Sequence, residues 1–240
     1  MDSAMMIAAA VSFIPTLLLF YYVLRGYTYP VVEEPFFKDS TVITLLFIGL
    51  IEGFLISAFY MMFADAWKNV LIGVGFAIVQ VLAVLVVLNL KRFHGKSDTV
   101  FYGFGLGLGQ GTGMSFGVAA MFINASGGMA GMDVLSWALL IVFIASELLL
   151  MCSVGTNVGE GVARLRFGEF CMQALLVAVL CMIFWSFTAM ASGSLLWIVP
   201  AFLMLGASAY YFYRTVYKGM SSVVADVLKI EGKKRNDMPR

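Results

Sequence analysis

Charged residues are scarce in this sequence. Only 12% of its 240 residues are Asp, Glu, Lys or Arg, whereas 62% are hydrophobic. About a quarter of a typical soluble domain is charged, so this chain has too few charged side chains to cover a water-facing surface. The composition excludes a soluble globular domain, a nucleic-acid-binding protein and a disordered protein. It predicts a polytopic membrane protein that is surrounded by a lipid bilayer.

Metal-binding and disulfide-forming residues are also few. The chain has one histidine, His94, and three cysteines, Cys152, Cys171 and Cys181, with no CxxC pair. A single histidine excludes a metal site built from several histidines of this chain. Cysteines in apolar stretches are usually small packing residues. The sequence therefore predicts no metal site and no cofactor.

Long continuous apolar runs are the main feature of the sequence. A helix needs about 20 mostly apolar residues to cross the hydrocarbon core, whereas barrel strands alternate polar and apolar residues. The sequence therefore predicts an all-α fold with seven transmembrane helices in residues 1–217 and a short basic tail in residues 218–240. We expect the spans at 4–25, 41–63, 70–90, 100–123, 133–154, 168–190 and 194–214. The first is expected to be a retained helix, because no basic residue precedes it and no cleavage motif follows it.

The basic residues predict how the chain is oriented. The loops after the first, third and fifth spans, together with the end of the seventh span at Arg214 and the tail, hold 14 of the 15 Lys and Arg residues. Lys68 is the one basic residue left for the other side. Because cytoplasmic loops carry an excess of Lys and Arg, we expect the N-terminus outside and the C-terminus in the cytoplasm of a cell membrane.

The tail after Tyr217 has the pattern of a short amphipathic helix. Ser221 and Ser222 can cap it, and Lys233, Lys234 and Arg235 follow it. We expect this basic cluster to lie against anionic lipid headgroups. The predicted apolar face consists of Val223, Val224, Val227, Leu228 and Ile230.

The fourth span carries glycine at regular spacing. Glycine lets helix backbones approach closely, and in lipid this approach replaces the hydrophobic effect as a driving force. We therefore expect this span to pack tightly, either at the centre of the bundle or against a helix of a second protein. The second span has a shorter pair, Gly49 and Gly53. The two registers in the fourth span are Gly105, Gly109, Gly113 and Gly117, and Gly103, Gly107, Gly111 and Ser115.

Five polar side chains lie at membrane depth. Glu52 is in the second span and Glu147 in the fifth, while Gln80, Gln110 and Gln173 are in the third, fourth and sixth. Ionisable groups at this depth are costly and are candidates for function. The two glutamates could form a paired-carboxylate site, a protonation site, or two separately hydrogen-bonded groups.

Seven spans, this orientation and the glycine-rich fourth span together resemble one family. It comprises the anterior pharynx-defective subunit of gamma-secretase and its prokaryotic relatives, the PrsW-type intramembrane proteases. Residues 79–92 look like the third helix of that family and the basic residues that follow it. Residues 100–123 look like its glycine zipper. The resemblance implies that the zipper holds a transmembrane helix of another protein, as the family's zipper holds presenilin.

The protease motifs of that family do not match this chain. Its Glu-Glu-x-x-Lys motif lies on the helix before the zipper, where this chain has Gln80 and no acid. The pair Glu33 and Glu34 precedes a different helix, with Lys38 one place too late. The fourth span has no glutamate. The family's intramembrane histidines are missing too, because His94 is the only histidine in the sequence. The resemblance therefore implies a non-catalytic member, closer to the scaffold subunit.

Three functions remain open. The favoured one is a non-catalytic membrane scaffold that packs another transmembrane helix through the fourth span. The second is an intramembrane protease, with Glu52 and Glu147 as its catalytic pair. The third is a small-solute or ion transporter in which these glutamates line a polar path. Glu52 and Glu147 adjacent across a water-filled cavity would favour the second or the third.

Overall fold

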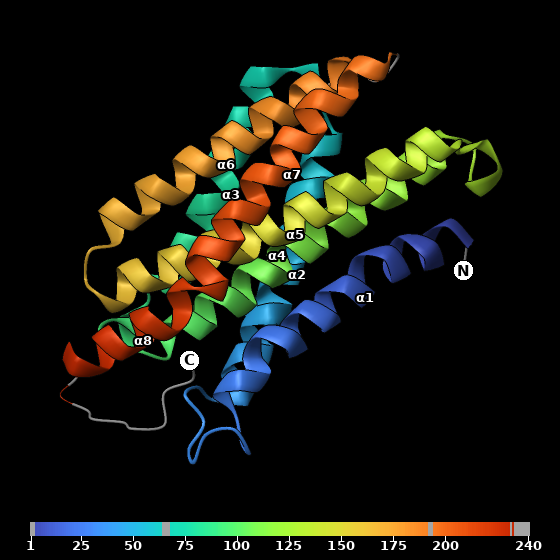
Figure 1. Cartoon of the computed structure of the whole chain (residues 1–240). Coiled ribbons are helices and arrows are strands. Elements are labelled where there is room, and N and C mark those ends of the chain that lie inside the picture. The colour runs from blue at the N-terminus through green and yellow to red at the C-terminus, as the bar shows by residue number, and fades with distance from the viewer. Residues whose placement is uncertain (1–2, 64–67, 192–193, 231, 233–240) are drawn as a thin grey trace.

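Every regular element that the structure describes is a helix. The structure is a computed structural model that describes residues 3–63, 68–191, 194–230 and 232. Seven helices are long and apolar enough to cross a membrane, which confirms the predicted all-helical, multi-pass fold (Figure 1). The first six are α1 (Ser3–Leu24), α2 (Asp39–Met61), α3 (Val70–Leu88), α4 (Thr99–Ala125), α5 (Val134–Ala163) and α6 (Phe167–Met190). The seventh is the helical run Leu195–Lys229, which contains α7 (Ile198–Phe212) and most of α8 (Gly219–Ile230).

The predicted span boundaries fail most clearly at the end of α5. We expected this span over 133–154, but the helix continues to Ala163. Glycine and polar residues in this segment lower its hydropathy and conceal its helical character. The helix continues because Gly155 and Gly159 pack directly against Gly103 of α4.

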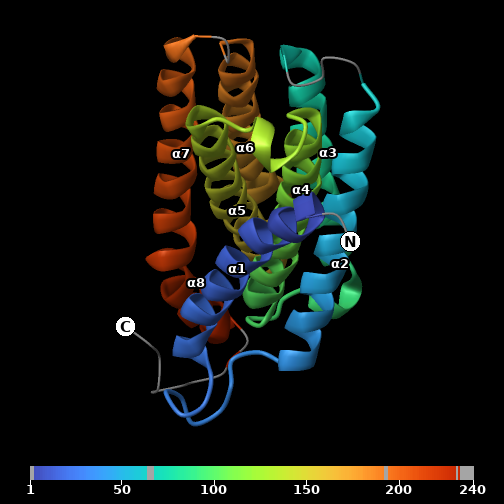
Figure 2. The same cartoon turned by 90° about the vertical axis from the view of Figure 1, so that its right-hand side faces the viewer.

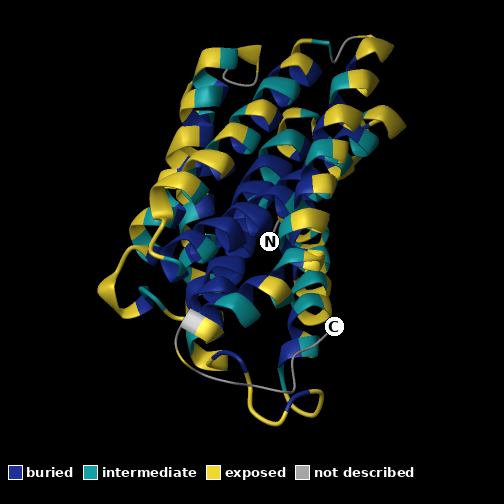
Figure 3. Cartoon of the chain, turned by 60° about the vertical axis from the view of Figure 1, so that its left-hand side comes forward, coloured by how far each residue is buried: buried dark blue, intermediate teal, exposed yellow. Residues whose placement is uncertain are grey.

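Helix α4 forms the centre of the bundle. Every residue from Thr99 to Ser115 is buried, and the buried residues of the chain gather in this region (Figure 3). Helices α2 and α5 flank α4 and share the most extensive contacts with it. Helices α3, α6 and α7 complete the bundle, because α6 contacts α3, α5 and α7.

Helix α1 crosses the bundle obliquely and packs chiefly on α4 (Figure 2). The hydroxyl groups of Thr16 and Thr112 are hydrogen-bonded at 2.7 Å. The rings of Phe13 and Phe116 meet edge to face, with their centroids 6.0 Å apart. Several large apolar or aromatic side chains of α1 are exposed in the described part of the chain: Met5, Met6, Ile14, Leu17, Leu18, Tyr21 and Tyr22.

The amphipathic tail helix is present as α8. It begins at Gly219, two residues before the predicted serine cap. Its apolar face is buried through Val223, Val224, Val227 and Leu228. On its polar face Asp226 pairs with Arg164 of the α5 end at 3.3 Å. The basic cluster 233–235, the side chain of Ile230 and residues 1–2 lie outside the described residues.

Candidate functional site

One glycine register of α4 faces α2. A Cβ atom added at Gly109 would collide with the backbone carbonyl of Leu46, and one at Gly113 would collide with that of Leu50. Gly105 lies against Val42, which also belongs to α2. At the far end of this seam, Gly117 lies against the Ser57 side chain, and Gly49 and Gly53 of α2 lie against the α4 backbone. This register therefore has no room for a helix of another protein.

The other glycine register of α4 faces α5. Added Cβ atoms at Gly103 and Gly107 would collide with the carbonyl groups of Gly155 and Met151, and one at Gly111 would lie 3.1 Å from the carbonyl oxygen of Glu147. Both registers are thus occupied by helices of the same chain. The glycines Gly155 and Gly159 of α5 were missed as packing residues, although their spacing repeats the pattern of α4.

Three of the five predicted polar residues meet inside the bundle. Gln80, Gln110 and Glu147 come from α3, α4 and α5, and all three are fully buried. The amide nitrogen of Gln80 donates to Oε1 of Glu147 at 2.8 Å. The amide nitrogen of Gln110 donates to the backbone carbonyl of Gln80 at 3.1 Å. We call these three side chains the polar centre.

Three oxygen atoms of the polar centre have no hydrogen-bond partner in the described part of the chain. Gln80 Oε1, Gln110 Oε1 and Glu147 Oε2 are buried and accept no hydrogen bond from the described residues. Each such group costs about 1–3 kcal/mol when no donor reaches it. Oxygen atoms of this kind attract a proton, a water molecule or a hard cation, and they disfavour an anion.

Aromatic and sulfur-containing side chains surround the polar centre. The buried hydroxyl of Tyr60 and the thiol of Cys181 both lie close enough to Glu147 for an electrostatic interaction. The Tyr60 ring packs on Phe76 of α3, with centroids 4.4 Å apart, and the Cys181 sulfur lies 3.6 Å from the Ser208 hydroxyl. Helices α2 and α6 therefore each place a buried side chain near Glu147.

Neither of the other two predicted residues is hydrogen-bonded to the polar centre in the described part of the chain. Glu52 of α2 is half-buried, and its Oε2 accepts no hydrogen bond from the described residues. No hydrogen bond joins Glu52 to Glu147 in the described part of the chain. Gln173 is exposed on α6. The two carboxyl groups therefore do not form a direct hydrogen-bonded pair in the described part of the chain.

The donor set of the polar centre does not suit a structural or catalytic zinc ion. Zinc prefers thiolate, imidazole and carboxylate ligands, whereas the centre offers two amides and one carboxyl group. Within the described residues, no group of three or more His, Cys, Asp and Glu side chains could hold a metal ion.

Two grooves flank α1 where it diverges from its neighbours. The first, of about 520 Å³, is walled by α1 and α5 near the middle of both helices. Its lining is almost entirely apolar and consists of Ala10, Val11, Ile14, Pro15, Ile141, Ile144 and Ala145. The second, of about 650 Å³, lies between the end of α1, the first loop and the start of α2. We call them the α1–α5 groove and the α1–α2 groove.

Comparisons with known proteins gave no match to a protein-family model, a curated protein or a solved structure.

Proposed function

We propose that this chain is a non-catalytic membrane protein that binds a transmembrane helix of another protein. The α1–α5 groove carries this proposal. It lies at the depth of Ile14 and Ile141, near the middle of two long apolar helices, and its volume is about 520 Å³. The glycine registers of α4 are not the binding surface in this proposal, because α2 and α5 already occupy them.

The shape and chemistry of the groove suit an apolar helix. Transmembrane helices associate through close van der Waals packing, which small residues permit. Ala10 on one wall and Ala145 on the other keep the groove wide, and both are accessible. Pro15 interrupts the hydrogen bonding of α1 beside the groove. A helix that fills the groove would bury exposed side chains of α1.

The proposal includes the orientation of the chain in the membrane. We propose that the N-terminus is outside and that the C-terminus is cytoplasmic in a cell membrane. The support is the sorting of 14 of 15 basic residues to one side of seven spans. We further propose that the basic tail beyond α8 lies against anionic lipid headgroups.

Site-specific photo-cross-linking tests the proposed surface. A photo-reactive residue at Ile141, which is 53% exposed in the groove, is expected to capture one transmembrane protein in native membranes. The same residue at Leu176, which is 66% exposed on α6 outside the groove, is the matched control and is expected to capture lipid. Peptide mapping should place the Ile141 adduct within an apolar segment of the partner. Lipid adducts at both positions would refute the proposal.

The polar centre favours a second candidate function, transport of a monovalent cation. Within the described residues, three buried oxygen atoms of the centre lack a donor, and each is of the type that binds a hard cation such as Na⁺. Sodium should then raise the melting temperature of the detergent-solubilised chain at constant ionic strength, because a ligand stabilises the state that binds it. Glu147→Gln should abolish this effect and Glu52→Gln should retain it. No sodium dependence in the unchanged chain would exclude this candidate.

A further inference from the structure

The α1–α2 groove combines apolar walls with a charged rim. Phe20, Leu24, Val42 and Ile43 line it on the side of the two helices. Its rim holds Arg25, directly after α1 ends at Leu24, and Asp39, where α2 begins. An amphiphile with a polar head and an apolar chain matches this division.

Within the described residues, neither rim charge has an ion-pair partner. The guanidinium of Arg25 lies over the Tyr22 ring, 5.0 Å from its centroid, and both Arg25 and Asp39 are exposed. The ion pairs of the described residues involve neither of them. Both groups are therefore available to a ligand that carries one negative and one positive charge.

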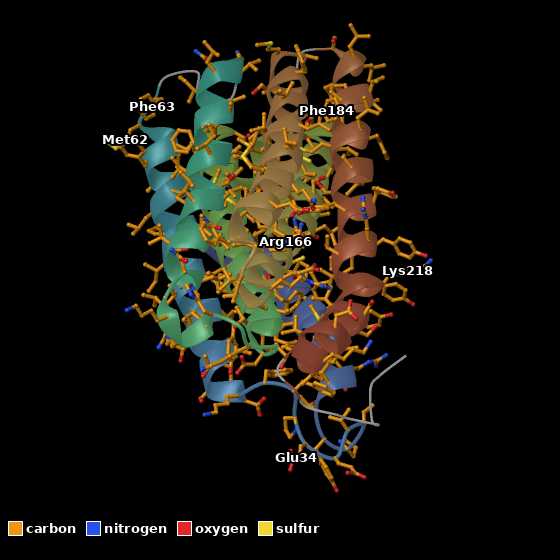
Figure 4. The ribbon with its side chains drawn as sticks, turned by 90° about the vertical axis from the view of Figure 1, so that its left-hand side faces the viewer. Glu34, Met62, Phe63, Arg166, Phe184 and Lys218 are labelled. Carbon is orange, nitrogen blue, oxygen red and sulfur yellow. The ribbon has the colours of Figure 1, made fainter. Side chains whose placement is uncertain are left out.

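The groove lies at the end of the bundle where a lipid headgroup would be. Helix α1 ends and α2 begins at the same end, where the first loop extends beyond the helices (Figure 2). Glu34 of that loop lies at this end of the molecule, whereas Met62 and Phe63 lie near the opposite end (Figure 4). Tyr21 and Tyr29 also line the groove, and tyrosine is enriched at membrane–water interfaces.

We propose that the α1–α2 groove binds a phospholipid with a primary-amine headgroup, an aminophospholipid. Arg25 binds the phosphate, for which a guanidinium offers paired N–H donors. Asp39 accepts hydrogen bonds from the ammonium group. The acyl chain extends along Phe20 and Ile43 into the membrane. The groove volume of about 650 Å³ falls within the usual range for a small-molecule site.

The rim discriminates against other common headgroups. A choline headgroup has the positive charge but no N–H donor for Asp39. A glycerol headgroup leaves the lipid with a net negative charge, which Asp39 repels. Specificity of this kind arises from unfavourable contacts with the wrong ligand as well as from favourable contacts with the right one. This proposal is independent of the partner helix, because its groove lies on the α2 side of α1.

Native mass spectrometry of the full chain in detergent tests the proposal. After delipidation, the chain is exposed to equimolar phosphatidylethanolamine, phosphatidylcholine and phosphatidylglycerol. We expect preferential retention of one phosphatidylethanolamine. Arg25→Gln should reduce retention of all three lipids, and that of phosphatidylethanolamine by about tenfold, the effect of losing one charge-assisted hydrogen-bonding group. Asp39→Asn should reduce the retention of phosphatidylethanolamine to that of phosphatidylcholine.

Two further variants complete the test. Lys91→Gln removes an exposed basic residue outside the groove and should leave lipid retention unchanged. Ile43→Trp fills the groove, whose Ile43 wall is 45% exposed, but keeps both charges, so it should reduce retention of all three lipids. The proposal is overturned if the unchanged chain retains the three lipids equally. It is also overturned if Arg25→Gln and Asp39→Asn behave like Lys91→Gln.

Discussion

Replacing Gly109 with alanine tests the packing between α4 and α2. The added Cβ would collide with the Leu46 carbonyl and would lie 3.0 Å from the Leu50 amide nitrogen. Both neighbours are backbone atoms, so no side chain can rotate away and the helices must separate. Overpacking of this kind typically costs about 1–3 kcal/mol. We expect Gly109→Ala to fall in the upper part of that range.

Gly75→Ala and Gly206→Ala are the matched controls. Both glycines lie within membrane helices, on α3 and α7, and an added Cβ meets nothing within 4 Å. In membranes the helices persist when tertiary contacts are lost, so the helix propensity of alanine has little effect on the difference. We expect both controls to change stability by less than about 0.5 kcal/mol.

Unfolding from mild detergent into sodium dodecyl sulfate, followed by tryptophan fluorescence, provides the assay. The free energy of unfolding of Gly109→Ala should fall well below that of both controls. If the three variants unfold alike, α4 and α2 do not pack as closely as the structure shows. The conclusion that the chain itself occupies this glycine register would then be wrong.

Three other changes give distinct expectations. Gln80→Leu removes the donor to the buried carboxyl group and should cost about 1–3 kcal/mol, whereas Gln173→Leu on the exposed face of α6 should cost little; the same unfolding assay compares them. Thr16→Val breaks the bond between α1 and α4 and should cost about 1 kcal/mol, whereas Thr44→Val, whose hydroxyl bonds only within α2, should cost less. The side chain of Asp133 caps α5, and the hydrogen bonds from Ser136 lower the pKa of its carboxyl group. A lowered pKa contributes stability above the ordinary carboxyl pKa and loses it as pH falls through the folded value. Melting temperatures across acidic pH should therefore fall less for Asp133→Ala than for the unchanged chain; parallel curves would contradict this assignment.

The sequence was sufficient to predict the spans because each carries its own signal. Five of the seven expected runs match their helices with small boundary differences, since hydropathy determines which segments enter lipid. The seventh joins the predicted tail helix in one helical run that ends at Lys229. The other exception was the end of α5, where Gly155 and Asn157 lower hydropathy but are buried by neighbouring helices. In this segment the residues are surrounded by neighbouring helices instead of lipid. A single sequence does not reveal which helices those neighbours are.

The polar centre was only partly predictable. Glu147, Gln80 and Gln110 were recognised by their depth, but their meeting depends on how α3, α4 and α5 rotate about their axes. The same limitation applied to Gln173, which lies in the first third of α6 and is exposed. The glycine registers predicted close packing of α4, whereas the identity of the packed helices came from the tertiary structure.

The role of the α1–α5 groove is tested most directly by purification of the tagged chain from its native host in mild detergent. Three forms are compared: the unchanged chain, Ala10→Trp, which fills the groove, and Ala58→Trp, which adds the same side chain to an exposed site on α2. We predict a stoichiometric transmembrane partner with the unchanged chain and with Ala58→Trp, and its loss with a folded Ala10→Trp. A chain that purifies alone, or a partner that Ala10→Trp retains, would contradict the proposed function.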